Sequence, residues 1–296
     1  MIRIGILGSD NSHALHFAKL CNIPDENGKY TYDDIRITAI YGKDDDPAHT
    51  KQVAEDGKIE FIAEKPEDFF GKVDAVMTVY RRGSYHVPEI LPFINAGYPV
   101  WIDKPLCTSL EDIEKLREAV AKNNTLITGG STAKYATVVT EMRELMESGT
   151  LGESRGAVFN FPGDLASMYE GIYFYGPHNV EMMLGVLGYD VRSVNVTVLS
   201  DNRFTAVVNY QNAQAVLNFV SCGNYYITVY GDKKAESRPL DTSTIYKLGF
   251  DKFAEMLHTK KLPLSFDELA KPIYILDAMK KSIAEKREVF MSEYSL

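Results

Sequence analysis

Lys104 and His178 have side chains of types that move protons, and both are candidates to act on a substrate. Lys104 directly follows the apolar run 100–102 and precedes Pro105, so it comes at the end of a predicted strand. A lysine there can orient a substrate oxygen and stabilise a developing alkoxide, and desolvation would lower its pKa toward neutrality. His178 titrates near neutral pH without any shift, which suits a general acid or base. The alternatives are a salt-bridged surface lysine and a hydrogen-bonded histidine at a helix start.

The turn after the apolar run 2–7 is a candidate phosphate loop. A strand, a glycine-rich turn and a helix together hold a pyrophosphate, because the turn points free N–H groups and a helix N-terminus at it. Set against the pattern G-x-G-x-x-G, this turn keeps only the first glycine, with Asp10 at the second position and His13 at the third. The Asp10 carboxylate either repels the pyrophosphate or caps the helix. We expect the six residues of this turn to bind a dinucleotide: Gly8, Ser9, Asp10, Asn11, Ser12 and His13.

Later loops of the same half carry further candidates for cofactor contacts. The acid that usually binds the ribose is missing from the end of the run 35–41, and the acidic cluster 44–46 comes slightly late. Arg81 and Arg82 follow the run 75–80, where they either meet a phosphate or carboxylate or form a solvated pair. We expect four residues of these loops to contact the cofactor: Tyr80, Arg81, Asp103 and Lys104.

Two pairs of side chains have the spacing of metal ligands on a helix. His13 and His16 stand three residues apart, as do His178 and Glu181. Two ligands without a third are weak support for a site, because such pairs commonly cap helices or make surface contacts. We therefore expect no metal.

Alternating strands and helices position the first group of candidates. Near-continuous apolar runs predict strands buried on both faces at 2–7, 35–41, 75–80, 100–102 and 126–128. Apolar residues at helical spacing predict helices at 14–21, 50–56, 87–96 and 110–123. This alternation implies right-handed crossovers and an α/β fold with a doubly wound parallel (Rossmann) sheet.

The pattern changes after residue 130. A predicted helix at 137–147 is followed by strands at 154–161, 193–199, 204–210, 215–221 and 225–230. Many of them alternate apolar and polar residues, which favours a mainly antiparallel sheet with one covered face. The tail returns to helices at 249–258 and 265–286. We expect a dinucleotide-binding domain at 1–130 and an α+β domain at 131–296 for substrate binding and oligomerisation, with the last helices packing back on the first domain.

Composition bounds the class of protein. The 296 residues are 45% hydrophobic, enough for two well-filled domains. The net charge is 32 − 41 = −9, which argues against binding to nucleic acid or to an anionic membrane. No run suits a signal peptide or a membrane span. The cysteines, Cys21, Cys107 and Cys222, are far apart and lack metal-ligand spacing. We expect reduced thiols and a cytoplasmic protein.

Several motifs, taken in order, resemble the Gfo/Idh/MocA family, the glucose-fructose oxidoreductase and inositol dehydrogenase group. Asp103-Lys104-Pro105 is similar to its Glu-Lys-Pro motif, and residues 148–152 are similar to its turn into the substrate domain. Its motif Asp-x-Gly-x-His-x-x-Asp is matched at 174–181, where the glycine and the histidine agree and Glu181 replaces an acid by an acid. Phe174 replaces the leading aspartate, a group that often orients a polyol in this family.

The resemblance implies an oxidoreductase that uses NAD or NADP to oxidise or reduce a sugar, a polyol or a related hydroxy compound. It assigns general acid–base work to His178 and polarisation of the substrate oxygen to Lys104. We expect Tyr135, Tyr175 and Asn179 to contact the substrate, although the aromatic run 169–175 could instead seal a domain interface. A homodimer or homotetramer through the C-terminal sheet is typical of the family. The alternative is a non-catalytic binding or regulatory protein that keeps the fold without tight dinucleotide binding.

Overall fold

The computed structural model describes residues 1–43 and 45–294 and divides into two compact units. Unit 1 comprises residues 1–107, 111–129 and 250–266, and unit 2 comprises 108–110, 130–249 and the segment from 267 onward. Asp44, one of the three clustered acids, lies outside the described residues.

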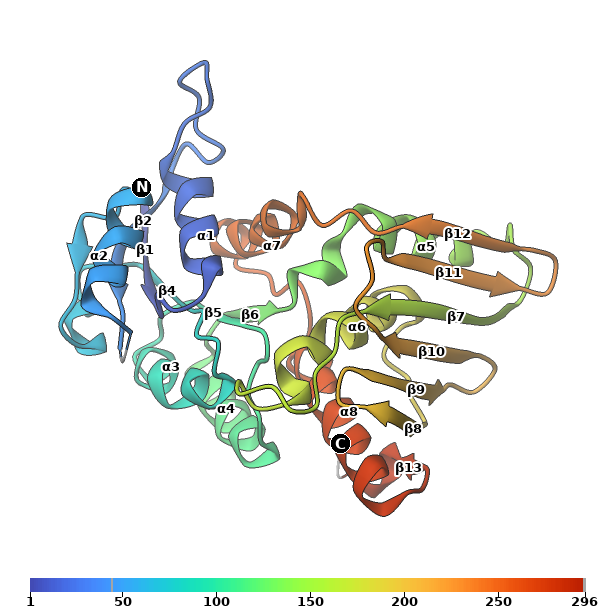
Figure 1. Ribbon diagram of the computed structural model, residues 1–296. Coiled ribbons are helices and arrows are strands. Elements are labelled where there is room, and N and C mark those ends of the chain that lie inside the picture. Colours follow the sequence, from blue (N-terminus) through green and yellow to red (C-terminus); the bar gives the residue numbers. More distant parts are fainter. Residues whose placement is uncertain (44, 295–296) are drawn as a thin grey trace. The chain divides into compact units, whose positions relative to one another are not determined.

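Unit 1 is built on a six-stranded parallel sheet. Its strands stand in the order β3 (Phe61–Ile62), β2 (Ile35–Tyr41), β1 (Ile2–Leu7), β4 (Ala75–Thr78), β5 (Val100–Asp103) and β6 (Ile127–Gly130). All of them except β3 are labelled in Figure 1. This is the strand order of doubly wound nucleotide-binding sheets, in which ligands bind beyond the carboxyl ends of the strands. The predicted α/β class with a parallel sheet is confirmed.

Five helices belong wholly or mainly to unit 1. They are α1 (Ser12–Asn22), α2 (Pro47–Asp56), α3 (His86–Asn95), α4 (Leu110–Asn123) and most of α7 (Ile245–Thr259). Helix α7 enters the core through aromatic rings, because Phe250 lies 5.8 Å from Phe17 and Phe253 lies 5.9 Å from Trp101, centre to centre. All four rings are fully buried, so a segment near the C-terminus helps to complete the first core.

Unit 2 contains a seven-stranded mixed sheet. Its order is β12 (Ala235–Pro239), β11 (Tyr226–Gly231), β7 (Ser154–Phe161), β10 (Gln214–Phe219), β9 (Arg203–Asn209), β8 (Ser193–Ser200) and β13 (Val289–Phe290). Strands β7 and β10 run parallel and the other pairs antiparallel, which confirms the expected mainly antiparallel sheet. Helices α5 (Thr137–Glu147) and α6 (Ile172–Leu187) cover one face, as Figure 1 shows, so buried and half-exposed residues alternate along β9 and β10.

Helix α6 was not predicted by the sequence pattern, because Gly176 and Pro177 lie inside it and both disfavour helix interiors. Packing explains the glycine: a Cβ there would lie 2.7 Å from Cδ2 of Leu276 in α8 (Phe266–Glu285). Tertiary contacts therefore override local propensity in this segment.

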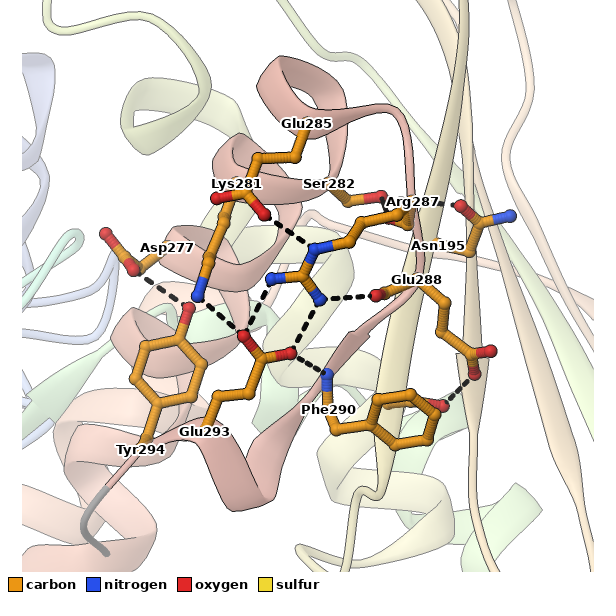
Figure 2. A network of polar contacts seen from close by, with 11 residues as sticks. Asn195, Asp277, Lys281, Ser282, Glu285, Arg287, Glu288, Phe290, Glu293 and Tyr294 are labelled. Carbon is orange, nitrogen blue, oxygen red and sulfur yellow. Dashed lines mark hydrogen bonds and ion pairs between the residues drawn. The ribbon is translucent and has the colours of Figure 1, made fainter.

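The end of the chain is fixed to unit 2 by a polar network (Figure 2). The Arg287 guanidinium donates to both carboxylate oxygens of Glu293 at 2.7 Å, and Lys281 donates to the same carboxylate at 2.6 Å. The Ser282 hydroxyl donates to the carbonyl of Arg287 at 2.6 Å and accepts from the N–H of Val196 at 3.0 Å. The network joins α8 to β8 and to the final turn.

Within residues 1–43 and 45–294, no helix combines the length and apolar character needed to cross a membrane. Cys21 and Cys107 are buried thiols and Cys222 is an exposed one, and none of the three forms a disulfide with another described residue.

Candidate active site

The phosphate-loop candidate follows β1 as predicted, but its capping differs from the expectation. Gly8 has φ +108°, and a Cβ there would lie 3.0 Å from the backbone nitrogen of Tyr80, so this position requires glycine. The N-cap of α1 is Asn11, whose side-chain oxygen accepts from the N–H of His13 at 3.3 Å. The interpretation of Asp10 as the cap is therefore wrong. Its carboxylate instead accepts from the N–H of Arg81 at 3.3 Å, and burial raises its pKa.

An acid from the cluster after β2 reaches the same loop. The Ser9 hydroxyl donates to Asp45 at 2.6 Å and lies 2.8 Å from the hydroxyl of Thr50. Asp45 thus lies at the phosphate loop although it comes four residues after the last residue of β2. The chain between them turns back through Lys43, which has φ +51°.

Three buried polar atoms of this region have no hydrogen-bond partner among the described residues: Nδ2 of Asn11, Oδ1 of Asp10 and Oδ1 of Asp103. Buried polar groups in proteins are nearly always hydrogen-bonded, so such orphans indicate groups that a ligand satisfies. An amide donor at a helix N-terminus suits a phosphate oxygen, and carboxylate oxygens suit sugar hydroxyls. The residues present therefore fit a dinucleotide.

His13 and Asp103, the residue before Lys104, form a buried pair. Nδ1 of His13 lies 2.5 Å from the carboxylate of Asp103, which is fully buried at the end of β5. Burial alone would raise the pKa of Asp103, but the charge and hydrogen bond of His13 outweigh it and hold that pKa below its ordinary value. Asp103 is therefore an acceptor, and Nδ1 of His13 carries the proton. The histidine at the third glycine position links the phosphate loop to the loop of Lys104.

Lys104 itself is 3% exposed, and burial lowers its pKa to about 8. The opposing charges of Asp103 and Asp10 raise this pKa and the charge of Arg81 lowers it. These three residues, each predicted to contact the cofactor, therefore lie close enough to Lys104 to interact with it. An amine with this pKa exchanges its proton near neutral pH, which excludes the alternative of an ordinary surface lysine.

His86 was missed in the sequence analysis. It is fully buried at the start of α3, with Nδ1 2.6 Å from the carbonyl of Pro105 and Nε2 3.0 Å from the carbonyl of Tyr80. It therefore joins the loop after β4 to the loop after β5, and burial lowers its pKa. Its position directly before the predicted helix 87–96 and after a strand end was the available signal.

In unit 2, His178 lies on α6 and is held from the segment after β6. Its Nδ1 lies 2.7 Å from the hydroxyl of Ser131. Both oxygens of Glu181 bind that same segment, since one accepts from the N–H of Ser131 and the other from the ammonium of Lys134, each at 2.8 Å. Burial would lower the pKa of Lys134, but the carboxylate of Glu181 raises it above its ordinary value.

Ser131 and Lys134 were not among the sequence candidates. Ser131 is the N-cap of the short turn η3 (Thr132–Tyr135) that follows β6, and Lys134 lies within that turn. Polar residues after the carboxyl end of a parallel strand were the signal that could have identified them. His178 is hydrogen-bonded, but it is in the second turn of its helix rather than at the helix start that the alternative expected.

The three expected substrate residues all belong to unit 2 and differ in setting. Asn179 is fully buried and donates to the carbonyl of Asn218 at 3.3 Å, while its side-chain oxygen has no partner among the described residues. The Tyr135 hydroxyl is a second such orphan. Tyr175 is 36% exposed and packs at 4.7 Å on Phe174, ring centre to ring centre. Tyr135 and Asn179 thus keep polar atoms available for a ligand.

Neither pair with metal-ligand spacing gains a third ligand. Across the part of the chain that the structure describes, no three His, Cys, Asp or Glu side chains gather as a metal ion would need. Glu181, one member of these pairs, is held by Ser131 and Lys134.

Comparison with known proteins gives a consistent result. Residues 2–131 match the model of a family described as "Oxidoreductase family, NAD-binding Rossmann fold". Inositol 2-dehydrogenase 3 of Saccharopolyspora erythraea is 37% identical over 81 residues, which make up 27% of this chain and 24% of that protein. The sequence match thus spans about a quarter of that relative.

Solved structures extend the similarity of fold to nearly the whole chain. A putative myo-inositol dehydrogenase from Sinorhizobium meliloti has a TM-score of 0.82 at 18% identity, covering 98% of this chain and 100% of that one. Scyllo-inositol dehydrogenase from Lactobacillus casei, crystallised with NAD(H) and scyllo-inositol, has a TM-score of 0.80 at 14% identity and covers 99% of both chains.

Proposed function

We propose that this chain, a member of the Gfo/Idh/MocA oxidoreductase family by its residues 2–131, transfers a hydride between NAD and a hydroxyl-bearing carbon of a sugar or polyol. The observation that carries the proposal is Lys104, a buried lysine with a pKa of about 8 at the end of β5. Strand ends of such a sheet are where ligands bind, and oxidation of an alcohol needs a group that takes up its proton. The inositol dehydrogenases among the similar proteins support the substrate class.

The phosphate loop would hold the pyrophosphate of NAD. Nδ2 of Asn11 and the N-terminus of α1 supply donors, and the orphan oxygens of Asp10 and Asp103 suit ribose hydroxyls. Because burial raises the pKa of Asp10, its carboxyl group is more readily neutralised beside a phosphate than an exposed one would be. The bound nicotinamide would accept or supply the hydride.

Lys104 and His178 would divide the work at the substrate oxygen. The oxygen loses a proton in one direction of the reaction and gains one in the other, and a developing alkoxide needs a donor. Lys104 can exchange a proton near pH 8, and His178 can give or take a hydrogen bond through Nε2 while Ser131 engages Nδ1. Tyr135 and Asn179 would bind further hydroxyls of the substrate through their orphan atoms. With Phe174 in place of an acid, these contacts would orient the polyol.

Titration with NADH and NADPH tests the proposal. Binding is followed by nicotinamide fluorescence and by the melting temperature, and a ligand at 100 times its Kd adds about 2.7 kcal/mol of stability. We expect a response to NADH, followed by turnover of at least one cyclic polyol or sugar acid. Absence of a response to either nucleotide at millimolar concentration would instead support a non-catalytic binding protein. A response to NADPH alone would overturn the choice of NAD.

A homodimer or homotetramer through the second sheet accompanies this proposal. The face away from α5 and α6 carries uncharged residues such as Val207, Val216 and Asn218, which are only half-exposed, and Leu199 nearby is 77% exposed. A broad uncharged face of this kind is typical of an interface. Light scattering tests the mass, and Val207→Glu should yield monomers. Thiols that form no disulfide among the described residues support a cytoplasmic location, which fractionation of cells would test.

A further inference from the structure

Among the described residues, the hydroxyl of Ser131 has a single acceptor to which it can donate a hydrogen bond. Ser131 is fully buried, and its oxygen accepts from the N–H of Ala133 at 3.2 Å. Among the residues described, the only acceptor within reach of the hydroxyl hydrogen is Nδ1 of His178, at 2.7 Å. A buried hydroxyl that failed to donate would lose a hydrogen bond that water cannot replace. The hydroxyl therefore donates to Nδ1.

This donation fixes where neutral His178 keeps its own proton. An imidazole nitrogen that accepts a hydrogen bond carries no hydrogen, so the ring hydrogen is on Nε2. We propose that Ser131 is a positioning residue that holds His178 in the Nε2–H form, so that His178 donates a hydrogen bond to the substrate oxygen and does not remove its proton. The catalytic part of this proposal rests on the proposed function, whereas the tautomer does not.

Contacts around Ser131 hold its hydroxyl beside the imidazole ring of His178. Its backbone N–H donates to Glu181, which is in turn bound by Lys134, and all three residues are under 8% exposed. Glu181 is one helical turn after His178, so both side chains lie on the same face of α6. By binding Ser131 and Lys134, the carboxylate of Glu181 keeps η3 against that face. The ring of Phe161 lies 5.1 Å from that of His178 and restricts its rotation. The serine thus supplies the orienting contact that an acid gives in many catalytic histidines.

The assignment reverses the roles first expected of the two proton-moving residues. With Nε2 already protonated, neutral His178 has no lone pair there to receive the hydroxyl proton. In oxidation, the neutral amine of Lys104 would take up the O–H proton and become an ammonium, and NAD⁺, when bound, would supply the acceptor for the C–H hydride, so that a carbonyl remains. In reduction, the same ammonium returns the proton to oxygen. His178 stabilises the charge on that oxygen in both directions.

The tautomer can be read directly in the full-length protein labelled with ¹⁵N-histidine. Long-range ¹H–¹⁵N spectra above pH 8 distinguish a nitrogen that carries hydrogen from one that does not, and His178→Asn identifies the signal among the six histidines. We expect a hydrogen-bearing Nε2 and a bare Nδ1. The reverse assignment in the wild type would overturn the proposal whether or not a Ser131 variant folds.

Three variants test the part played by the serine. Ser131→Ala should move the Nδ1 signal toward that of an imidazole without a hydrogen bond, and Ser131→Thr should restore it. Ser148→Ala removes a hydroxyl bonded to Leu145 and Thr150 instead, and it should leave the signal unchanged. An unchanged signal in a folded Ser131→Ala would overturn the proposal. With a substrate in hand, Ser131→Ala should lower kcat about tenfold, with the Kd for NADH unaltered.

The outcomes also separate this inference from the proposed function. If His178 is in the Nε2–H form but the protein binds no nucleotide, the proposed function is wrong and the assignment of the tautomer stands. Nδ1–H in a protein that binds NADH and turns over a polyol would remove the inference alone.

Discussion

Lys104 and Lys134 are two buried lysines with opposite properties. Each comes shortly after a strand of the parallel sheet, and they are 3% and 7% exposed. Lys134 donates to the carboxylate of Glu181 at 2.8 Å, and that carboxylate raises its pKa. The acid beside Lys104 is Asp103, whose carboxylate is bound by His13, and burial lowers the pKa of Lys104 to about 8. The use made of the neighbouring acid, and not the degree of burial, separates a lysine that holds structure from one that can exchange a proton.

Replacing Lys104 should give the largest effect. Lys104→Met removes the amine to which we assign uptake of the substrate proton, so kcat/KM should fall by about 10²–10⁴-fold, the usual contribution of a general base. Lys104→Arg should not restore activity, because a guanidinium stays protonated at any working pH. Steady-state kinetics measure both variants, and the Kd for NADH serves as the control. Retention of activity within tenfold by Lys104→Met would show that the two lysines do not differ in this way.

Breaking the Lys134 pair should act on stability. Glu181→Gln keeps an oxygen for the N–H of Ser131 but leaves the buried ammonium of Lys134 without its counter-charge, which should cost about 3–5 kcal/mol. The double variant with Lys134→Met should recover most of this loss, because no buried charge remains. Urea unfolding measures the free energy of each protein.

The control for that experiment is Glu153→Gln. The carboxylate of Glu153 lies 3.2 Å from the guanidinium of Arg155, and both side chains are mainly exposed. This change should therefore leave the midpoint of urea unfolding unchanged. Equal losses in Glu181→Gln and Glu153→Gln would contradict a structural role for Lys134.

The sequence predicts the bounds of an element well where apolar residues are regularly spaced, and poorly where they are not. The bounds of β1, β2, β7, α4 and α5 agree with the predicted ranges, because their apolar spacing is regular and turn residues flank them. Strand β12 was missed, since Ala235-Glu236-Ser237-Arg238-Pro239 has no apolar alternation and is a strand only by pairing with β11.

Of the candidate site, the sequence indicated single residues better than pairs. Lys104 and the phosphate loop were found from their places after strands. The contacts of His13 with Asp103 and of Ser131 with His178 join residues 90 and 47 positions apart, and no local pattern encodes such contacts. For the same reason the sequence could not tell which acid each lysine uses.

The stability of the protein should depend on pH through Lys104. Its folded pKa of about 8 is below the ordinary 10.5, so below pH 8 both states hold the proton and the folded state bears the full cost of a buried charge. Between these two values the folded protein releases the proton and the cost declines. Lys104→Met should therefore be more stable than the wild type at pH 7, with a smaller difference at pH 9.5. Urea midpoints at both pH values measure this, and a difference that does not change with pH would contradict the low pKa.

A smaller change should follow Asp103→Asn. The carboxylate of Asp103 raises the pKa of Lys104, so its removal should move the midpoint of the pH–rate profile to below 8. The profile of kcat/KM measures this shift. Movement to higher pH would contradict the charge of Asp103 as a factor that raises the pKa of Lys104.

The smallest effect belongs to the exposed network at the chain end. Arg287 and Lys281 hold the pKa of Glu293 well below its usual range (Figure 2). A carboxylate with a lowered pKa adds stability above its unfolded value, and this stability is lost as the pH falls through the folded one. Glu293→Gln should thus lower the melting temperature slightly at pH 7 and by less at pH 2, and 1 M salt should remove most of the difference by screening. The loss in Glu181→Gln should persist in 1 M salt, because the pair with Lys134 is buried. Equal sensitivity of both variants to salt would show that water reaches Lys134, and the contrast between the two buried lysines would then need another cause.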